Sequence, residues 1–177
     1  MLDGFERPTY VGVIFDMDDY TIGKQNALGA IKKILSDFVT KIGINSRLFV
    51  AGNENLPKTH GESVYQVTSY SGRSDTMSLD VKFKDCIHGI GAQENCNKYV
   101  ILITNRYGKN FPHHYEKALK INQIKEYGCE VIIFEMRTST QQLSKLADEY
   151  KSKYVFVNEM QTFNHCIQEI LKEIGHG

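Results

Sequence analysis

Continuous apolar stretches alternate along this chain with stretches in which apolar residues recur every three or four positions. The continuous runs cover residues 10–15, 48–51, 99–104, 131–134 and 154–157. Runs of this kind, rich in β-branched and aromatic residues, are typical of strands buried on both faces, and hence of a parallel sheet. Residues 63–68 alternate between apolar and polar instead, which predicts a half-exposed strand at an edge of the sheet.

The stretches between these runs predict amphipathic helices. Apolar residues at helical spacing mark residues 28–42, 79–90, 118–127, 143–150 and 163–174. Gly43, Gly128 and Gly175 are placed to end three of these helices. The alternation predicts a doubly wound α/β fold, in which a mostly parallel six-stranded sheet carries helices on both faces. We expect a single domain over residues 1–177, because no repeat, low-complexity segment or linker interrupts the pattern.

Composition narrows the classes of function. Lys and Arg number 21 and Asp and Glu number 21, so no overall field favours nucleic acid or an anionic membrane. No apolar stretch approaches the roughly 20 residues that cross a bilayer, and the N-terminus lacks signal-peptide features. The 4 cysteines contain no Cys-x-x-Cys pair, which favours a reducing environment. We therefore expect a cytoplasmic protein with neither a nucleic-acid nor a membrane partner.

An acidic cluster follows the first apolar run. Asp16, Asp18 and Asp19 lie where the predicted first strand ends. Ligands of open α/β sheets bind beyond the carboxyl ends of the strands, and clustered carboxylates are costly unless a cation or hydrogen-bond donors offset them. The cluster therefore predicts a binding site at this edge. The alternative is that Asp19 caps the next helix while the other two carboxylates are solvated.

Polar residues at or near the ends of predicted elements occur at four places in the chain: Asp16, residues 72–76, residues 101–105 and residues 155–159. In this order they resemble the von Willebrand factor A-type domain, as found in integrin inserted domains, and the resemblance covers nearly the whole chain. It implies a Rossmann-like sheet with the strand order and helix placement of that family. The alternation of residues 64–68 beside continuous apolar strands further predicts that this edge strand is antiparallel.

The resemblance implies a metal-ion-dependent adhesion site that holds Mg²⁺. The family builds this site from Asp-x-Ser-x-Ser, a Thr of the middle loop and an Asp after the fourth strand. Carried over by position, the metal ligands are Asp16, Asp18, Ser74 and Asn105, with Tyr20 replacing the second Ser. Magnesium requires compact oxygen ligands at about 2.0–2.1 Å, a geometry that Tyr20 cannot supply. We therefore expect a degenerate site, either weak or vestigial.

A protein-binding module of the adhesion or scaffold type, rather than an enzyme, is the function that the resemblance implies. The partner protein binds at the C-terminal face of the sheet, where its acidic residue completes the coordination of any bound Mg²⁺. The partner contacts are expected among aromatic, Arg and acidic residues of the surrounding loops, namely Asp19, Tyr20, Arg73, Arg106 and Tyr107. The alternative for these side chains is ordinary loop packing.

A second family shares part of the pattern. Residues 15–18 resemble the nucleophile motif of haloacid-dehalogenase-type phosphatases, and residues 103–105 resemble their second motif. This resemblance implies that Asp16 attacks phosphorus while Asp18 transfers protons and Mg²⁺ neutralises the phosphate. Glu159 stands alone, however, where that family has paired acids completing the metal site. A magnesium-dependent phosphatase is therefore the alternative function.

Overall fold

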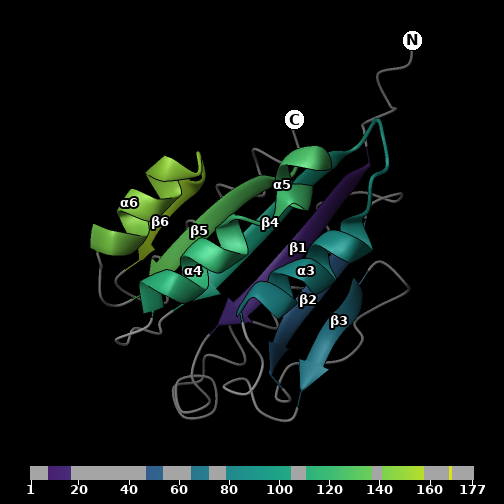
Figure 1. The fold of residues 1–177 in the computed structure, drawn as a ribbon. Coiled ribbons are helices and arrows are strands. Elements are labelled where there is room, and N and C mark those ends of the chain that lie inside the picture. Colours follow the sequence, from purple (N-terminus) through teal and green to yellow (C-terminus); the bar gives the residue numbers. More distant parts are fainter. Residues whose placement is uncertain are drawn as a thin grey trace.

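The described part of the computed structural model begins with three strands, after which helices alternate with the remaining strands (Figure 1). The structure describes residues 8–16, 47–53, 65–71, 79–104, 111–136, 141–157 and 168. The strands are β1 (Thr9–Asp16), β2 (Arg47–Asn53), β3 (Tyr65–Ser71), β4 (Asn97–Thr104), β5 (Glu130–Met136) and β6 (Lys153–Val157). The helices are α3 (Leu79–Ile90), α4 (Phe111–Leu119), α5 (Asn122–Glu126) and α6 (Gln141–Glu149).

The strands form one sheet in the order β3-β2-β1-β4-β5-β6, and every neighbouring pair is parallel. β1 lies between β2 and β4 near the centre of the sheet, and Val11, Val13 and Ile14 are fully buried. All carboxyl ends of the strands therefore meet at one edge of the sheet. The α/β class predicted from the alternation of apolar patterns is confirmed.

The edge strand β3 lies where its alternating pattern predicts, but its predicted direction is wrong. β3 runs parallel to β2, with Leu48 opposite Tyr65 and Phe49 opposite Gln66, and the register shifts between Val50 and Ala51. Alternation reports that one face of a strand is exposed, and this holds for an edge strand of either direction. The pattern therefore identifies the position of the strand and carries no information about its orientation.

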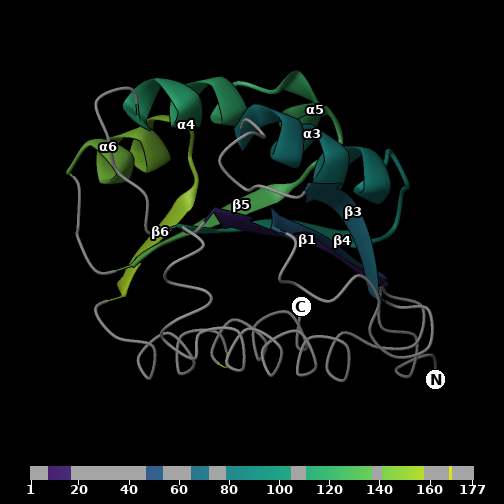
Figure 2. The same ribbon diagram turned by 90° about the horizontal axis from the view of Figure 1, so that it is seen from below.

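The described helices all cover the same face of the sheet (Figure 2). α3 packs on β1 and β2 through Phe83, Cys86 and Ile90, which are fully buried. The predicted helices over residues 28–42 and 163–174 lie outside the described residues except for Gln168, so the doubly wound arrangement stays a prediction. In the described part of the chain, no helix combines the length and the apolarity needed to cross a membrane.

The single helix predicted over residues 118–127 is two helices. α4 ends at Leu119, and Ile121 then takes extended backbone angles (φ −61°, ψ 118°) before α5 begins. Apolar spacing continues across this interruption, which is why periodicity alone does not reveal it. Gly128 (φ +69°) ends α5 as predicted, and the amide of Cys129 donates to the carbonyl of Ile124 at 2.8 Å.

α3 approaches β1 closely at Gly12. A Cβ atom added to Gly12 would lie 2.8 Å from the Cβ of Cys86 and 3.3 Å from its Sγ. The Cβ and Sγ atoms of Cys86 lie close to the backbone of a packed helix, so they cannot move aside without a loss of packing energy. Glycine at this position therefore sets how closely the helix layer lies over the central strand.

We expect Gly12→Ala to lower the free energy of unfolding by about 1–3 kcal/mol, because the added methyl group overpacks the contact with α3. Urea unfolding followed by circular dichroism measures this change. An unfolding free energy equal to that of the natural protein would show that α3 shifts away without cost, and would contradict the close approach described here.

Candidate functional site

The strand order reverses between β1 and β4: β2 and β3 extend the sheet to one side, and β5 and β6 extend it to the other. Loops that leave the carboxyl ends of β1 and β4 must therefore diverge, and open α/β sheets bind their ligands in the crevice formed there. Asp16 ends β1, Thr104 ends β4, and the two residues are register partners. The switch point of the sheet thus coincides with the polar end of the first apolar run.

Lys82 of α3 supplies a positive charge beside Asp16. The Nζ atom of Lys82 lies 3.4 Å from Oδ1 of Asp16, and the two side chains are 0% and 9% exposed. Lys82 lies in the first turn of α3, which begins near the carboxyl edge of the sheet. Burial of either charge alone would be strongly unfavourable, so the two charges compensate each other.

Tyr115 of α4 reaches Asp16 as well. Its hydroxyl donates to Oδ2 of Asp16 at 3.5 Å and lies 2.5 Å from Oγ1 of Thr104. Either hydroxyl can be the donor in the hydrogen bond between Thr104 and Tyr115. We call Asp16, Lys82, Thr104 and Tyr115 the Asp16 cluster; all four residues are buried.

The Asp16 cluster connects the strands and helices that border three chain segments. The segment after Asp16 leaves β1, residues 72–78 lead into α3, and residues 105–110 connect Thr104 to α4. Each member of the cluster lies in the strand or helix that borders one of these segments. The cluster therefore fixes the distances between the points from which the predicted binding loops depart.

Among the predicted site residues, the structure describes Asp16. The others lie outside the described residues: Asp18, Asp19, Tyr20, Arg73, Ser74, Asn105, Arg106 and Tyr107. Their attachment to β1, α3 and β4 follows from the chain, while their contacts stay predictions. Among the described residues there is no group of three or more His, Cys, Asp and Glu side chains that could hold a metal ion.

The metal role implied for Asp16 fits its surroundings poorly. One carboxylate oxygen faces the ammonium of Lys82 and the other accepts from Tyr115. An ion bonded to Oδ1 at about 2.1 Å would lie close to the buried ammonium, and the two cations would repel each other. Asp16 is therefore compensated by a protein cation.

Lys82 and Tyr115 are the members of the site that the motifs do not indicate. A signal for them exists in the helical periodicity. Lys82 follows Leu79 by three residues and precedes Cys86 by four, so it falls on the apolar face of its helix. Tyr115 precedes Ala118 and Leu119 by three and four residues in the same way. A lysine on a buried helix face requires an acidic partner, and Asp16 is that partner here.

Two further buried acids at this edge also have partners. Asp80, 5% exposed, is 3.7 Å from Nζ of Lys84 and 3.6 Å from Nζ of Lys117, which links α3 to α4. Glu135 of β5, 2% exposed, accepts a hydrogen bond from the hydroxyl of Tyr154. No buried polar side-chain atom lacks a hydrogen-bond partner in the part of the chain that the structure describes. The described buried polar side chains at this edge therefore all have hydrogen-bond partners.

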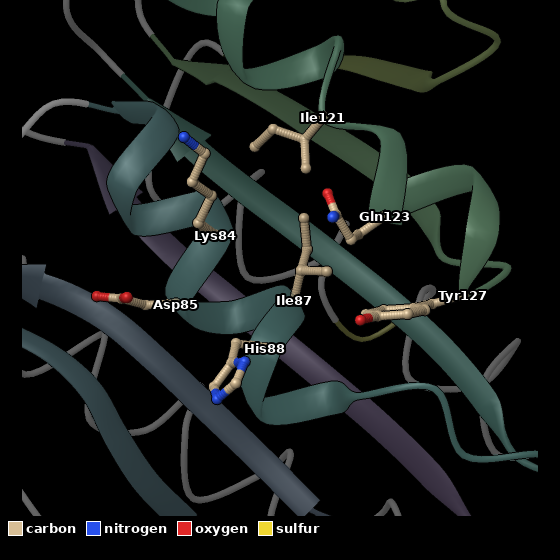
Figure 3. Close-up of a pocket in the computed structure, with 7 residues that line it drawn as sticks. All are labelled: Lys84, Asp85, Ile87, His88, Ile121, Gln123 and Tyr127. Carbon is tan, nitrogen blue, oxygen red and sulfur yellow. The ribbon is translucent and has the colours of Figure 1, made fainter.

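A separate groove lies between α3 and α5 (Figure 3). It encloses about 350 Å³ and is lined by Lys84, Asp85, Ile87, His88, Ile121, Gln123 and Tyr127. Ile87 and Ile121 form its apolar floor, with Gln123 and Tyr127 on the α5 side. None of the lining residues belongs to the Asp16 cluster, so the groove and the carboxyl edge are distinct candidate surfaces.

The sequence matches no protein-family model, and it matches no characterised protein. A functional assignment therefore depends on the motifs and on the geometry of the carboxyl edge. Of the two surfaces described above, only this edge combines a topological switch point with the loops that the motifs single out.

Thr104→Val and Tyr115→Phe each remove one side of a buried hydrogen bond. We expect each to lower the free energy of unfolding by about 1–3 kcal/mol, the cost of removing one partner of a buried hydrogen bond. Because both changes delete the same interaction, the double variant should lose less than the sum of the two losses, with a coupling of about 0.5–3 kcal/mol. Urea unfolding of the four proteins measures this coupling.

Thr104→Val combined with Tyr127→Phe provides the matched control. Tyr127 lies at the opposite end of the helix layer, beside Lys98 near the start of β4. The two losses should therefore add. Additivity of the Thr104 and Tyr115 changes themselves would contradict the hydrogen bond between them.

Proposed function

We propose that this chain is a protein-binding module of the von Willebrand factor A type, with a doubly wound sheet, that engages a partner through the loops at its carboxyl edge. The observation that carries this proposal is the Asp16 cluster at the switch point between β1 and β4. It gives three loops one rigid base. Rigid placement of loop residues lowers the entropy lost on binding, which favours recognition by a surface.

The side chains available at this edge favour recognition over chemistry. Asp16 is 6% exposed and engaged with Lys82 and Tyr115, so it is not placed to attack a substrate. The attached loops contain Tyr20, Arg106 and Tyr107, and aromatic and Arg side chains contribute most of the energy at protein interfaces. The edge therefore suits a partner protein better than it suits a small substrate.

Tyr20→Ala and Arg106→Ala test this surface. Proteins retained by the immobilised natural chain are identified by mass spectrometry, and a purified candidate is then titrated by calorimetry. We expect either change to raise the dissociation constant at least about tenfold, the loss typical of truncating an interface anchor. Lys145→Ala is the control, because Lys145 is exposed on α6, a helix that borders none of these loops in the sequence.

A partner whose affinity is insensitive to the Tyr20 and Arg106 changes would contradict binding at the carboxyl edge. Tyr127→Ala identifies the other candidate surface in that case, since Tyr127 lines the groove between α3 and α5. Loss of binding through Tyr127→Ala alone would move the interface to that groove.

The phosphatase alternative requires the carboxylate of Asp16 as a nucleophile. Because Lys82 and Tyr115 hold both of its oxygens beneath α3 and α4, we expect no hydrolysis of p-nitrophenyl phosphate with Mg²⁺ above the rate of Asp16→Asn. A spectrophotometric assay of both proteins decides this. Turnover by the natural chain that Asp16→Asn abolishes would establish the phosphatase; equal turnover by both would indicate a contaminating enzyme.

A further inference from the structure

We infer that Lys82 acts as a resident cation at the carboxyl edge, taking over at Asp16 the charge compensation that the A-type resemblance assigns to a divalent ion. This inference rests on the proposed function, because it concerns the same edge. It adds that the binding loops are held without a metal ion at Asp16. Lys82 is accordingly a positioning residue that acts through Asp16.

The first step is the saturation of the Asp16 carboxylate. Oδ1 lies 3.4 Å from Nζ of Lys82, and Oδ2 accepts the hydroxyl of Tyr115 at 3.5 Å. An ion bonded to Oδ1 at about 2.1 Å would be at most about 5.5 Å from the ammonium nitrogen. In a buried environment, charges of the same sign at this separation repel strongly. Direct coordination through Oδ1 of Asp16 is therefore opposed by the charge of Lys82.

The second step is that Lys82 has no route to solvent in the folded state. Its side chain is 0% exposed and lies on the helix face that also buries Leu79, Phe83 and Cys86. Lys84, two residues further along the same helix, has a side chain that is 61% exposed. Lys84 can exchange its partners with water, whereas Lys82 is enclosed beside Asp16.

The third step is the position of the pair between loops. Lys82 follows residues 72–78, which contain Ser74, and Asp16 precedes the segment that contains Asp18. An ion shared by these loops would hold them together. The ammonium of Lys82 already connects α3 with the end of β1, the two elements that border these loops. Loop placement at this edge should therefore not respond to divalent ions through Asp16.

Mn²⁺ is a suitable probe, because it prefers the same oxygen ligands as Mg²⁺ and its free concentration is measured by electron paramagnetic resonance. The proteins compared are the natural chain, Asp16→Asn, Lys82→Met, and the double variant Lys82→Met with Asp16→Asn. Lys84→Met is the matched control, since it removes an exposed ammonium from the same helix. Thermal unfolding with and without Mn²⁺ is recorded for each.

We expect the natural chain and Asp16→Asn to have Mn²⁺ affinities equal within about twofold, because Asp16 is already compensated. Lys82→Met should unfold at a lower temperature and regain stability when Mn²⁺ is added, since the ion can then approach Asp16. The double variant should show no such gain. Lys84→Met should behave as the natural chain does.

Two results would overturn the inference. The first is a loss of Mn²⁺ affinity of about tenfold or more on Asp16→Asn in the presence of Lys82, which would make Asp16 a ligand of the natural protein. The second is a folded Lys82→Met variant that gains no Mn²⁺ stabilisation, which would make the contact a simple ion pair. If Lys82→Met does not fold, the comparison of Asp16→Asn with the natural chain still decides. No partner protein is used, so failure here and failure of the proposed binding surface are separate outcomes.

Discussion

The ion pair between Lys82 and Asp16 is the interaction on which the carboxyl edge depends. The side chain of Lys82 is fully buried and that of Asp16 is 9% exposed, and removing one partner of a buried ion pair typically costs about 3–5 kcal/mol because the other charge is left uncompensated. The pair also couples α3 to the end of the central strand, and Tyr115 extends this coupling to α4. One carboxylate thus determines how two helices sit over β1.

The sequence predicts most of the fold because the apolar runs of its central strands are buried. The continuous runs at residues 10–15 and 99–104 correspond to β1 and β4, and the alternation at residues 63–68 corresponds to the edge strand β3. Orientation depends on the connection between strands and not on their faces, so the direction of β3 could not be predicted from alternation. The interruption at Ile121 escapes prediction for a related reason: it leaves the apolar spacing intact.

The site could be predicted only in part. Asp16 stands out because it ends the first buried run, and the rule that ligands bind at the carboxyl edge gives it a function. Its partner is separated from it by 66 residues, and no local pattern links the two. The position of Lys82 on an apolar helix face predicts that it pairs with a buried acid. Several acids in this chain could be that partner, and the topology of the sheet places Asp16 beside it. The motif therefore indicates the acid, while the fold determines which cation lies beside it.

The all-parallel pairing of the described strands also has a consequence for folding. No described pair of strands is joined by a hairpin, and β1 pairs with β4 across a long stretch of chain, with Thr9 opposite Asn97. Such non-local pairings form slowly, because the entropy of closing a long loop is lost before the contacts are made. Asp16 and Thr104 come together only when this closure is complete. The Asp16 cluster and the folded core should therefore appear in the same kinetic step, so that a partially folded chain lacks the completed carboxyl edge.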